Sequence, residues 1–248
     1  MIDIKKILKD LAVRRPVFHS EADFKFALAW AIQEADGKAK VRLEYPAFPG
    51  NTEDRWIDLW VRTAERPLAI ELKYITRDVR LAARLDDGSD EVFNLKNHAA
   101  PNQRRFDYVY DICRLEVLAK ANTNLVGYAI LVTNVSAFWS PGRSKRQGDA
   151  LKLHENRCLS GTLAWADGTS EGTKSGRADV LKLTGEYTMQ WNDYSSVADV
   201  VGGKFRYLLT EVPRYEGVTG LPQTRAELEP AEERLTLAAT DGGGCIRS

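Results

Sequence analysis

The spacing of hydrophobic residues along the chain predicts two long helices. Between residues 21 and 36, apolar side chains recur every three or four positions, as they do on one face of an α-helix. Ser20 followed three residues later by Asp23 is typical of a helix start, and Gly37 ends the pattern. The same periodicity returns from Asn102 to Lys120 and predicts the second helix.

Three short segments between these helices have the composition of strands. They are rich in aromatic and β-branched residues and are separated by turns that contain Pro, Gly or charged residues. The segments are Val41 to Tyr45, Trp56 to Val61 and Leu68 to Ile75. They predict a three-stranded meander, followed by a polar and irregular stretch at residues 77–98. The nearly all-apolar segment from Leu125 to Val135 predicts a central strand covered on both faces.

The pattern is weaker in the C-terminal half of the chain. Residues 136–157 are predicted to form a loop, and further strands are expected at residues 161–166, 180–187 and 205–212. After Val212 the periodicity fades, so we expect a flexible tail over residues 213–248 with a short helix near Ala226 to Leu237. The sequence therefore predicts one α/β domain at residues 1–212, with a mixed β-sheet flanked by helices and additional C-terminal strands.

Composition and charge narrow the classes of function. The 248 residues include 35 Lys and Arg against 35 Asp and Glu, so the whole molecule has no net attraction for polyanions. Contact with nucleic acid would need a local basic patch, and the predicted loop at 136–157 offers one through Arg143, Lys145 and Arg146. Three cysteines without a pairing or zinc-binding spacing predict a reducing, cytoplasmic environment. No run of about 18 apolar residues is present, which predicts that the chain does not act at a membrane.

Acidic side chains on two neighbouring predicted strands are candidates for a metal-binding catalytic site. Alternation along the strand at 68–75 places Glu71 and Lys73 on the same face, and Asp58 stands on the preceding strand between two tryptophans. If these strands form a hairpin, Asp58 and Glu71 lie close together, where mutual repulsion and burial penalise both charges. A divalent cation would relieve that repulsion, and hard oxygen ligands favour Mg²⁺ or Mn²⁺.

Glu21 is the third candidate acid. It precedes Phe24 and Leu28 by three and seven residues and therefore falls on the apolar face of its helix, where it can turn toward the same site. A simpler alternative is that Glu21 only favours the helix amino terminus through the macrodipole. Likewise, Glu71 and Lys73 could form an ordinary exposed ion pair on a half-solvated sheet.

Taken together, Glu21 on an opening helix, Asp58, and then Glu71-Leu72-Lys73 on the next strand resemble the PD-(D/E)xK nuclease superfamily. This superfamily includes restriction endonucleases, resolvases and repair exonucleases. Its core is a helix, a three-stranded meander, a second helix and a further strand, which is the order predicted for residues 20–135. One departure is that Ile57 stands where the family motif has proline.

The resemblance implies a restriction-endonuclease-like fold and a site for Mg²⁺ or Mn²⁺. The implied metal ligands are Asp58, Glu71 and the Leu72 carbonyl, with Lys73 beside the attacking water and Glu21 as an auxiliary catalytic acid. Gln103, at the start of the second helix, resembles a glutamine that some branches place near the substrate. A solvated helix residue is the alternative for Gln103.

The function that follows from the resemblance is metal-dependent hydrolysis of DNA phosphodiester bonds, with the 3′ oxygen leaving and a 5′ phosphate remaining. A homodimer is compatible with this function. The alternative is a non-catalytic nucleic-acid- or protein-binding module built on a nuclease fold, because a fold by itself does not fix an activity.

Overall fold

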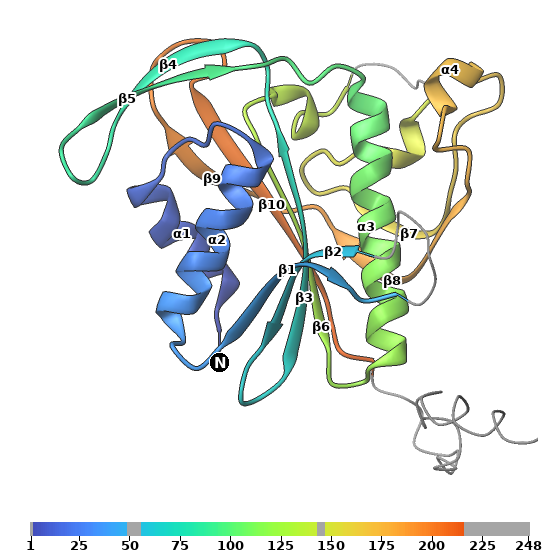
Figure 1. Cartoon of the computed structure of the whole chain (residues 1–248). Helices are drawn as coiled ribbons and strands as arrows, with labels where there is room; N and C mark the ends of the chain where they lie inside the picture. The colour runs from blue at the N-terminus through green and yellow to red at the C-terminus, as the bar shows by residue number, and fades with distance from the viewer. Residues whose placement is uncertain (1, 49–55, 143–146, 216–248) are drawn as a thin grey trace, which may run out of the picture. The chain divides into compact units, whose positions relative to one another are not determined.

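A mixed six-stranded β-sheet with helices on both faces organises the protein (Figure 1). The strand order is β1 (Lys40–Pro46), β2 (Trp56–Arg62), β3 (Pro67–Ile75), β6 (Val126–Thr133), β10 (Lys204–Val212) and β9 (Trp191–Ser196). Strands β3 and β6 run parallel, whereas the other neighbouring pairs are antiparallel. The prediction of an α/β fold with a mixed sheet flanked by helices is therefore confirmed.

The computed structural model describes residues 2–48, 56–142 and 147–215. These residues belong to one compact unit, Met1–Glu216. Three predicted phosphate contacts, Arg143, Lys145 and Arg146, lie outside the described residues. The same holds for the predicted tail from residue 216 onward and for its short helix at 226–237.

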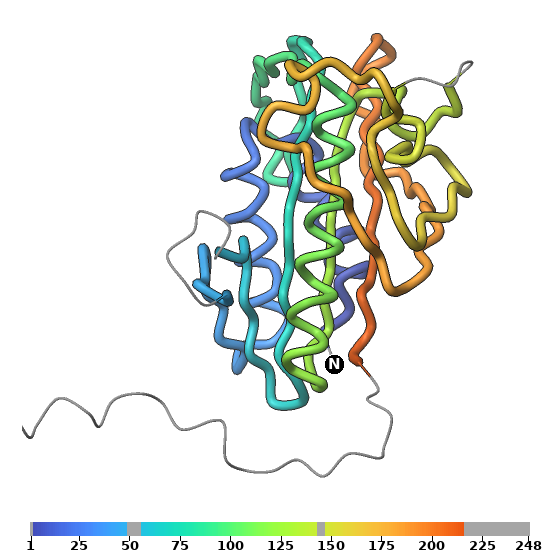
Figure 2. Tube along the Cα trace, turned by 90° about the vertical axis from the view of Figure 1, so that its right-hand side faces the viewer, coloured from blue at the N-terminus to red at the C-terminus, as the bar shows by residue number. Residues whose placement is uncertain are grey.

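Two helices cover one face of the sheet and a third covers the other. α1 (Ile4–Arg14) and α2 (Glu21–Ala35) pack on the first face, and α3 (Pro101–Ala121) lies lengthwise over the opposite face (Figure 2). The predicted start of α2 is confirmed, because Ser20 Oγ accepts the Asp23 backbone N–H at 3.1 Å. α1 was not predicted, although Asp3 caps it and its apolar residues recur at helical spacing.

The prediction of an irregular stretch at residues 77–98 was wrong. β4 (Val79–Arg84) and β5 (Asp90–Leu95) form an antiparallel hairpin between β3 and α3. Leu81 and Phe93 pack in the core, while the charged residues occupy the outward positions. Only alternate residues of this two-stranded ribbon are buried, so its hydrophobic signal is diluted by charge.

A second hairpin packs beside α3 in the C-terminal part. β7 (Cys158–Leu163) pairs with β8 (Leu181–Thr188), and apolar residues of both strands join the core cluster that includes α3. β7 begins three residues before the strand predicted at 161–166, and β9 was not predicted. The described part of the predicted loop at 136–157 contains two single-turn 3₁₀ helices, η2 (Ser136–Phe138) and η3 (Asp149–Leu151), and α4 (Glu171–Lys174) follows β7.

A buried carboxylate joins α3 to this hairpin. Glu116 accepts the backbone N–H groups of Thr184 and Gly185 at 2.8 to 3.0 Å and the Tyr187 hydroxyl at 2.8 Å. Because Glu116 is only 5% exposed, these donors have no ready access to water as a replacement acceptor. The interaction fixes α3 along its axis and thereby fixes the residues that α3 presents to β3.

We therefore expect Glu116→Ala to lower the free energy of unfolding by about 3 kcal/mol, because several buried donors lose their acceptor. Chemical denaturation followed by circular dichroism would measure the change. The exposed Lys120→Ala on the same helix is the matched control and should change stability by less than about 0.5 kcal/mol. Equal stabilities of the two variants would contradict the assigned role of Glu116.

Candidate active site

Strands β2 and β3 separate where the predicted motif begins. Their pairing runs from Arg62 opposite Pro67 to Leu59 opposite Ile70, while β3 continues to Ile75. Alternate residues of a strand direct their backbone N–H groups to the same edge, so Leu72 and Tyr74 present N–H groups on the side that β2 has left. This edge of β3 needs other hydrogen-bond acceptors.

Two of the predicted acids supply those acceptors. Asp58 Oδ2 accepts the Leu72 N–H at 2.8 Å, and Glu21 Oε2 accepts the Tyr74 N–H at 2.8 Å. The Leu72 carbonyl, a predicted metal ligand, points to the same edge because a strand residue directs its N–H and C=O to one side. Residues from α2 and β2 thus meet at the stretch of β3 that carries Glu71 and Lys73.

Glu71 and Lys73 point to the opposite face of the sheet from Leu72, toward α3. Arg114 Nη1 lies 2.7 Å from Glu71 Oε1, and Lys73 Nζ lies 2.8 Å from Asp111 Oδ2. The side chains of Glu71 and Asp111 are only 3% and 5% exposed, respectively, so neither pair is the exposed surface ion pair of the alternative interpretation. Asp111 and Arg114 are three residues apart and so share one face of α3.

Burial and crowding of acids shift the ionisation of this group. Burial raises the pKa of Glu71 well above its usual range, the charges of Asp111 and Asp58 raise it further, and Arg114 opposes the shift. Burial likewise raises the pKa of Asp111 to about 6, against the opposing charge of Lys73. For Lys73, burial lowers the pKa, but the charges of Asp111, Glu71 and Glu21 outweigh burial and raise it. Lys73 is therefore a cation in this arrangement.

Lys25 provides a third cation, on the α2 side of the site. Its Nζ lies 2.5 Å from Asp58 Oδ1 and also contacts Glu44 on β1. Burial lowers the pKa of Lys25, but the two carboxylates more than compensate and raise it. Lys25 lies four residues after Glu21, which places both side chains on the same face of α2.

The site opens into a cavity of about 470 Å³ between β3, the start of α2 and α3. Its lining residues are Glu21, Lys73, Tyr74, Ile75, His98, Arg104, Asp107, Tyr110, Asp111 and Arg114. His98 Nδ1 accepts the Thr76 backbone N–H at 3.0 Å, so the proton of the neutral ring is on Nε2. The cavity is therefore lined by hydrogen-bond donors as well as by acidic side chains.

Gln103 has a structural partner. Its side-chain nitrogen donates to the carbonyls of Gly172 and Thr173 at 3.2 and 3.0 Å, which ties the amino end of α3 to α4. Asp107, one turn later, accepts Arg177 through both of its oxygens at 2.5 and 3.0 Å. Gln103 thus positions the segment beside the cavity, and its contact with a substrate stays a prediction.

Sequence reasoning missed Lys25, Asp111 and Arg114. The signal for Lys25 is its four-residue spacing from Glu21. The signal for Asp111 and Arg114 is that charged residues interrupt the apolar face of a helix that packs on the strand carrying Glu71 and Lys73.

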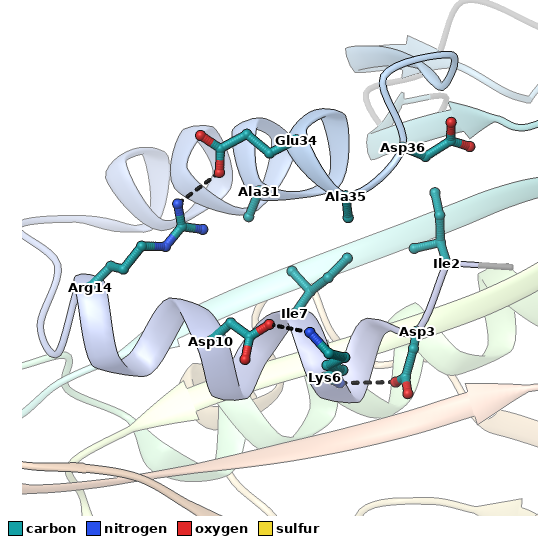
Figure 3. A pocket seen from close by; sticks show the side chains of 10 residues that line it. All are labelled: Ile2, Asp3, Lys6, Ile7, Asp10, Arg14, Ala31, Glu34, Ala35 and Asp36. Carbon is teal, nitrogen blue, oxygen red and sulfur yellow. Dashed lines mark hydrogen bonds and ion pairs between the residues drawn. The ribbon is translucent and has the colours of Figure 1, made fainter.

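A larger cavity, of about 770 Å³, lies between α1 and α2, away from these residues (Figure 3). Both cationic side chains in its lining are paired, Arg14 with Glu34 and Lys6 with Asp10, each at 2.7 Å. The lining also includes Asp3 and Asp36, which accept the backbone N–H groups of Lys6 and Lys38 at 2.9 and 3.0 Å, so its charged side chains have structural partners.

No protein-family model, curated protein or solved structure matches this chain. Within residues 2–48, 56–142 and 147–215, no three His, Cys, Asp or Glu side chains converge as a metal site. The predicted ligand set needs only two carboxylates and one carbonyl. In the same described part, none of the helices is long and apolar enough to cross a bilayer.

The role of Glu21 at the edge of β3 can be tested by stability. Glu21→Ala should lower the free energy of unfolding by about 1–3 kcal/mol, because the Tyr74 N–H loses its acceptor. Glu21→Gln keeps a carbonyl oxygen at this position and should lower the free energy of unfolding clearly less than Glu21→Ala. Urea denaturation of the two variants would give the comparison, and equal losses would show that the charge of Glu21, rather than its hydrogen bond, matters for folding.

Proposed function

We propose that this protein is a metal-dependent nuclease of the PD-(D/E)xK type that hydrolyses DNA phosphodiester bonds. The observation that carries the proposal is the meeting of Asp58, Glu71, Lys73 and Glu21 at the stretch of β3 from which β2 has separated. The order of elements from α2 to β6, with the β4–β5 hairpin inserted before α3, supports a restriction-endonuclease-like core.

The proposed metal ligands are suitable in chemistry for Mg²⁺ or Mn²⁺. Asp58, Glu71 and the Leu72 carbonyl offer only hard oxygen atoms. Glu71 Oε1 is buried and, beyond its ion pair with Arg114, has no hydrogen bond within the described residues, so it retains capacity to bind a cation. A bound ion would stabilise the negative charge that develops on the scissile phosphate.

The proposed role of Lys73 in catalysis depends on its positive charge. Held by Asp111 at 2.8 Å and kept protonated by the surrounding acids, its ammonium group can donate a hydrogen bond to a phosphate oxygen or to the attacking water. Neutralisation of Glu71 by a cation would lower the pKa of Lys73, because the charge of Glu71 is one of those that raise it. Glu21, on the wall of the same cavity, is the proposed auxiliary acid.

The burial of these charges favours an enzyme over a non-catalytic binding module. Removing Glu71, Asp111 and Lys73 from water costs stability that their mutual attraction only partly returns. Buried groups with shifted pKa values are concentrated at functional sites. A binding module would need no such arrangement behind its contact surface.

The direct test is incubation of the purified protein with plasmid and linear DNA in Mg²⁺ or Mn²⁺, and again with a chelator. Cleavage should require the metal and should fall by at least about 10²-fold in Lys73→Ala, because a positioned charge at the reacting group is lost. Asp58→Asn should also reduce cleavage and should weaken Mn²⁺ binding in calorimetry.

The control for this assay is Lys120→Ala, which removes a Lys from α3 outside the cavity and should cleave normally. Circular dichroism of each variant excludes loss of folding as the cause. DNA binding without any metal-dependent cleavage by the wild-type protein would favour the non-catalytic binding module instead.

DNA contact by the basic segment can be tested separately. Replacing Arg143, Lys145 and Arg146 together by Ala should weaken DNA binding and reduce the steepness of its salt dependence by about two to three units, because each phosphate contact releases counter-ions. Fluorescence anisotropy of labelled duplex in Ca²⁺ at several salt concentrations measures this slope. An unchanged slope would place the DNA elsewhere on the protein.

A further inference from the structure

The ion pair between Arg114 and Glu71 closes the buried end of the candidate site, and the proposed mechanism does not use Arg114. The two groups are 2.7 Å apart, with Glu71 3% and Arg114 14% exposed. Arg114 reaches Glu71 from α3, across the face of the sheet opposite to α2. One of the two proposed metal-binding carboxylates therefore already has an enclosed cationic partner.

Arg114 is also held by contacts that do not involve Glu71. Its Nη2 donates to the Trp56 carbonyl at the start of β2, and its guanidinium lies 5.0 Å from the centre of the Phe48 ring. Trp56 precedes the other proposed metal-binding carboxylate, Asp58, by two residues. Arg114 thus connects α3, β2 and β3, and its contacts with Trp56 and Phe48 do not depend on Glu71.

A guanidinium and a divalent cation cannot both bind Glu71 without mutual repulsion. At the few ångströms that would separate them, like charges in a poorly solvated site repel strongly. The carboxylates of Asp58 and Asp111 near Glu71 favour the presence of a cation, but they do not determine which cation it is. Arg114 and the metal are therefore competitors for the Glu71 carboxylate.

We propose that Arg114 is a positioning residue that serves as the resident counter-ion of Glu71, and that a divalent metal binds at Asp58 and Glu71 by displacing this guanidinium from Glu71. Arg114 keeps Glu71 directed into the site until the metal arrives, and its competition sets the metal affinity. This inference rests on the proposed function, because it assumes that Asp58 and Glu71 bind a metal.

Calorimetric titration of the full chain with Mn²⁺ tests this exchange of Arg114 for a metal ion at Glu71. Arg114→Gln should bind Mn²⁺ about tenfold more tightly than the wild-type protein, because one positive charge beside Glu71 is gone. Lys120→Gln removes one positive charge from the same helix outside the site and should bind Mn²⁺ like the wild type.

The outcomes separate this inference from the proposed function. Mn²⁺ binding by the wild-type protein, with unchanged or weaker binding by Arg114→Gln, would overturn the exchange and leave the metal site intact. Absence of Mn²⁺ binding in the wild type would overturn both the metal site and the exchange.

A second measurement avoids dependence on the folding of Arg114→Gln. The Nε–H resonance of Arg114, assigned by its disappearance in Arg114→Lys, can be followed by nuclear magnetic resonance during titration of the wild-type protein with Mg²⁺. The resonance should shift along the same curve as metal binding. A stationary resonance during demonstrated Mg²⁺ binding would overturn the displacement of Arg114.

Discussion

The requirement that buried backbone N–H groups find acceptors governs the arrangement around β3. Because β2 pairs with β3 only from Leu59 onward, the N–H groups of Leu72 and Tyr74 lack the strand that would have accepted them. Each unpaired group would cost about as much as a lost hydrogen bond. Asp58 and Glu21 satisfy them, so the same carboxylates that complete the sheet edge are gathered beside Glu71 and Lys73. Folding and the assembly of the site are thus one process.

The second requirement is charge balance in a partly enclosed space. The acids near β3 are balanced by cations from both faces of the sheet, Lys25 from α2 and Arg114 from α3, in addition to Lys73 on the strand itself. This balance depends on the position of α3 along its axis, which Glu116 fixes at a distance from the cavity. A shift of one helical turn would carry Arg114 about 5.4 Å from Glu71.

Local patterns were sufficient to predict most of the central elements. Helical periodicity predicted α2 and α3, and alternation along β3 placed Glu71 and Lys73 on one face, as the structure confirms. The proximity of Asp58 to this strand followed from the hairpin connection of β2 and β3. The nuclease assignment, which depends on the resemblance of these residues to a family motif, stays a prediction.

Features that depend on tertiary packing could not be predicted. Asp111 and Arg114 are ordinary charged residues of a helix until the register between α3 and β3 brings them to Lys73 and Glu71. The β4–β5 hairpin buries only one face of each strand, so its charged outward residues concealed the alternation. Gln103 was expected near a substrate, and only the folded arrangement reveals its hydrogen bonds to the α4 segment.

The placement of the β4–β5 hairpin has a consequence for how this protein can evolve. Among the described residues the hairpin pairs only with itself and joins no strand of the six-stranded sheet, and its two ends lie close in sequence to Ile75 at the end of β3 and to Pro101 at the start of α3. Residues added or removed at its turn, Leu85 to Ser89, would therefore leave the register of the main sheet unchanged. The turn can thus diverge in length and charge at little structural cost, and because Asp86 lies there beside residues of α1 and α2, such changes would alter that surface while the buried charged groups at β3 stay constant.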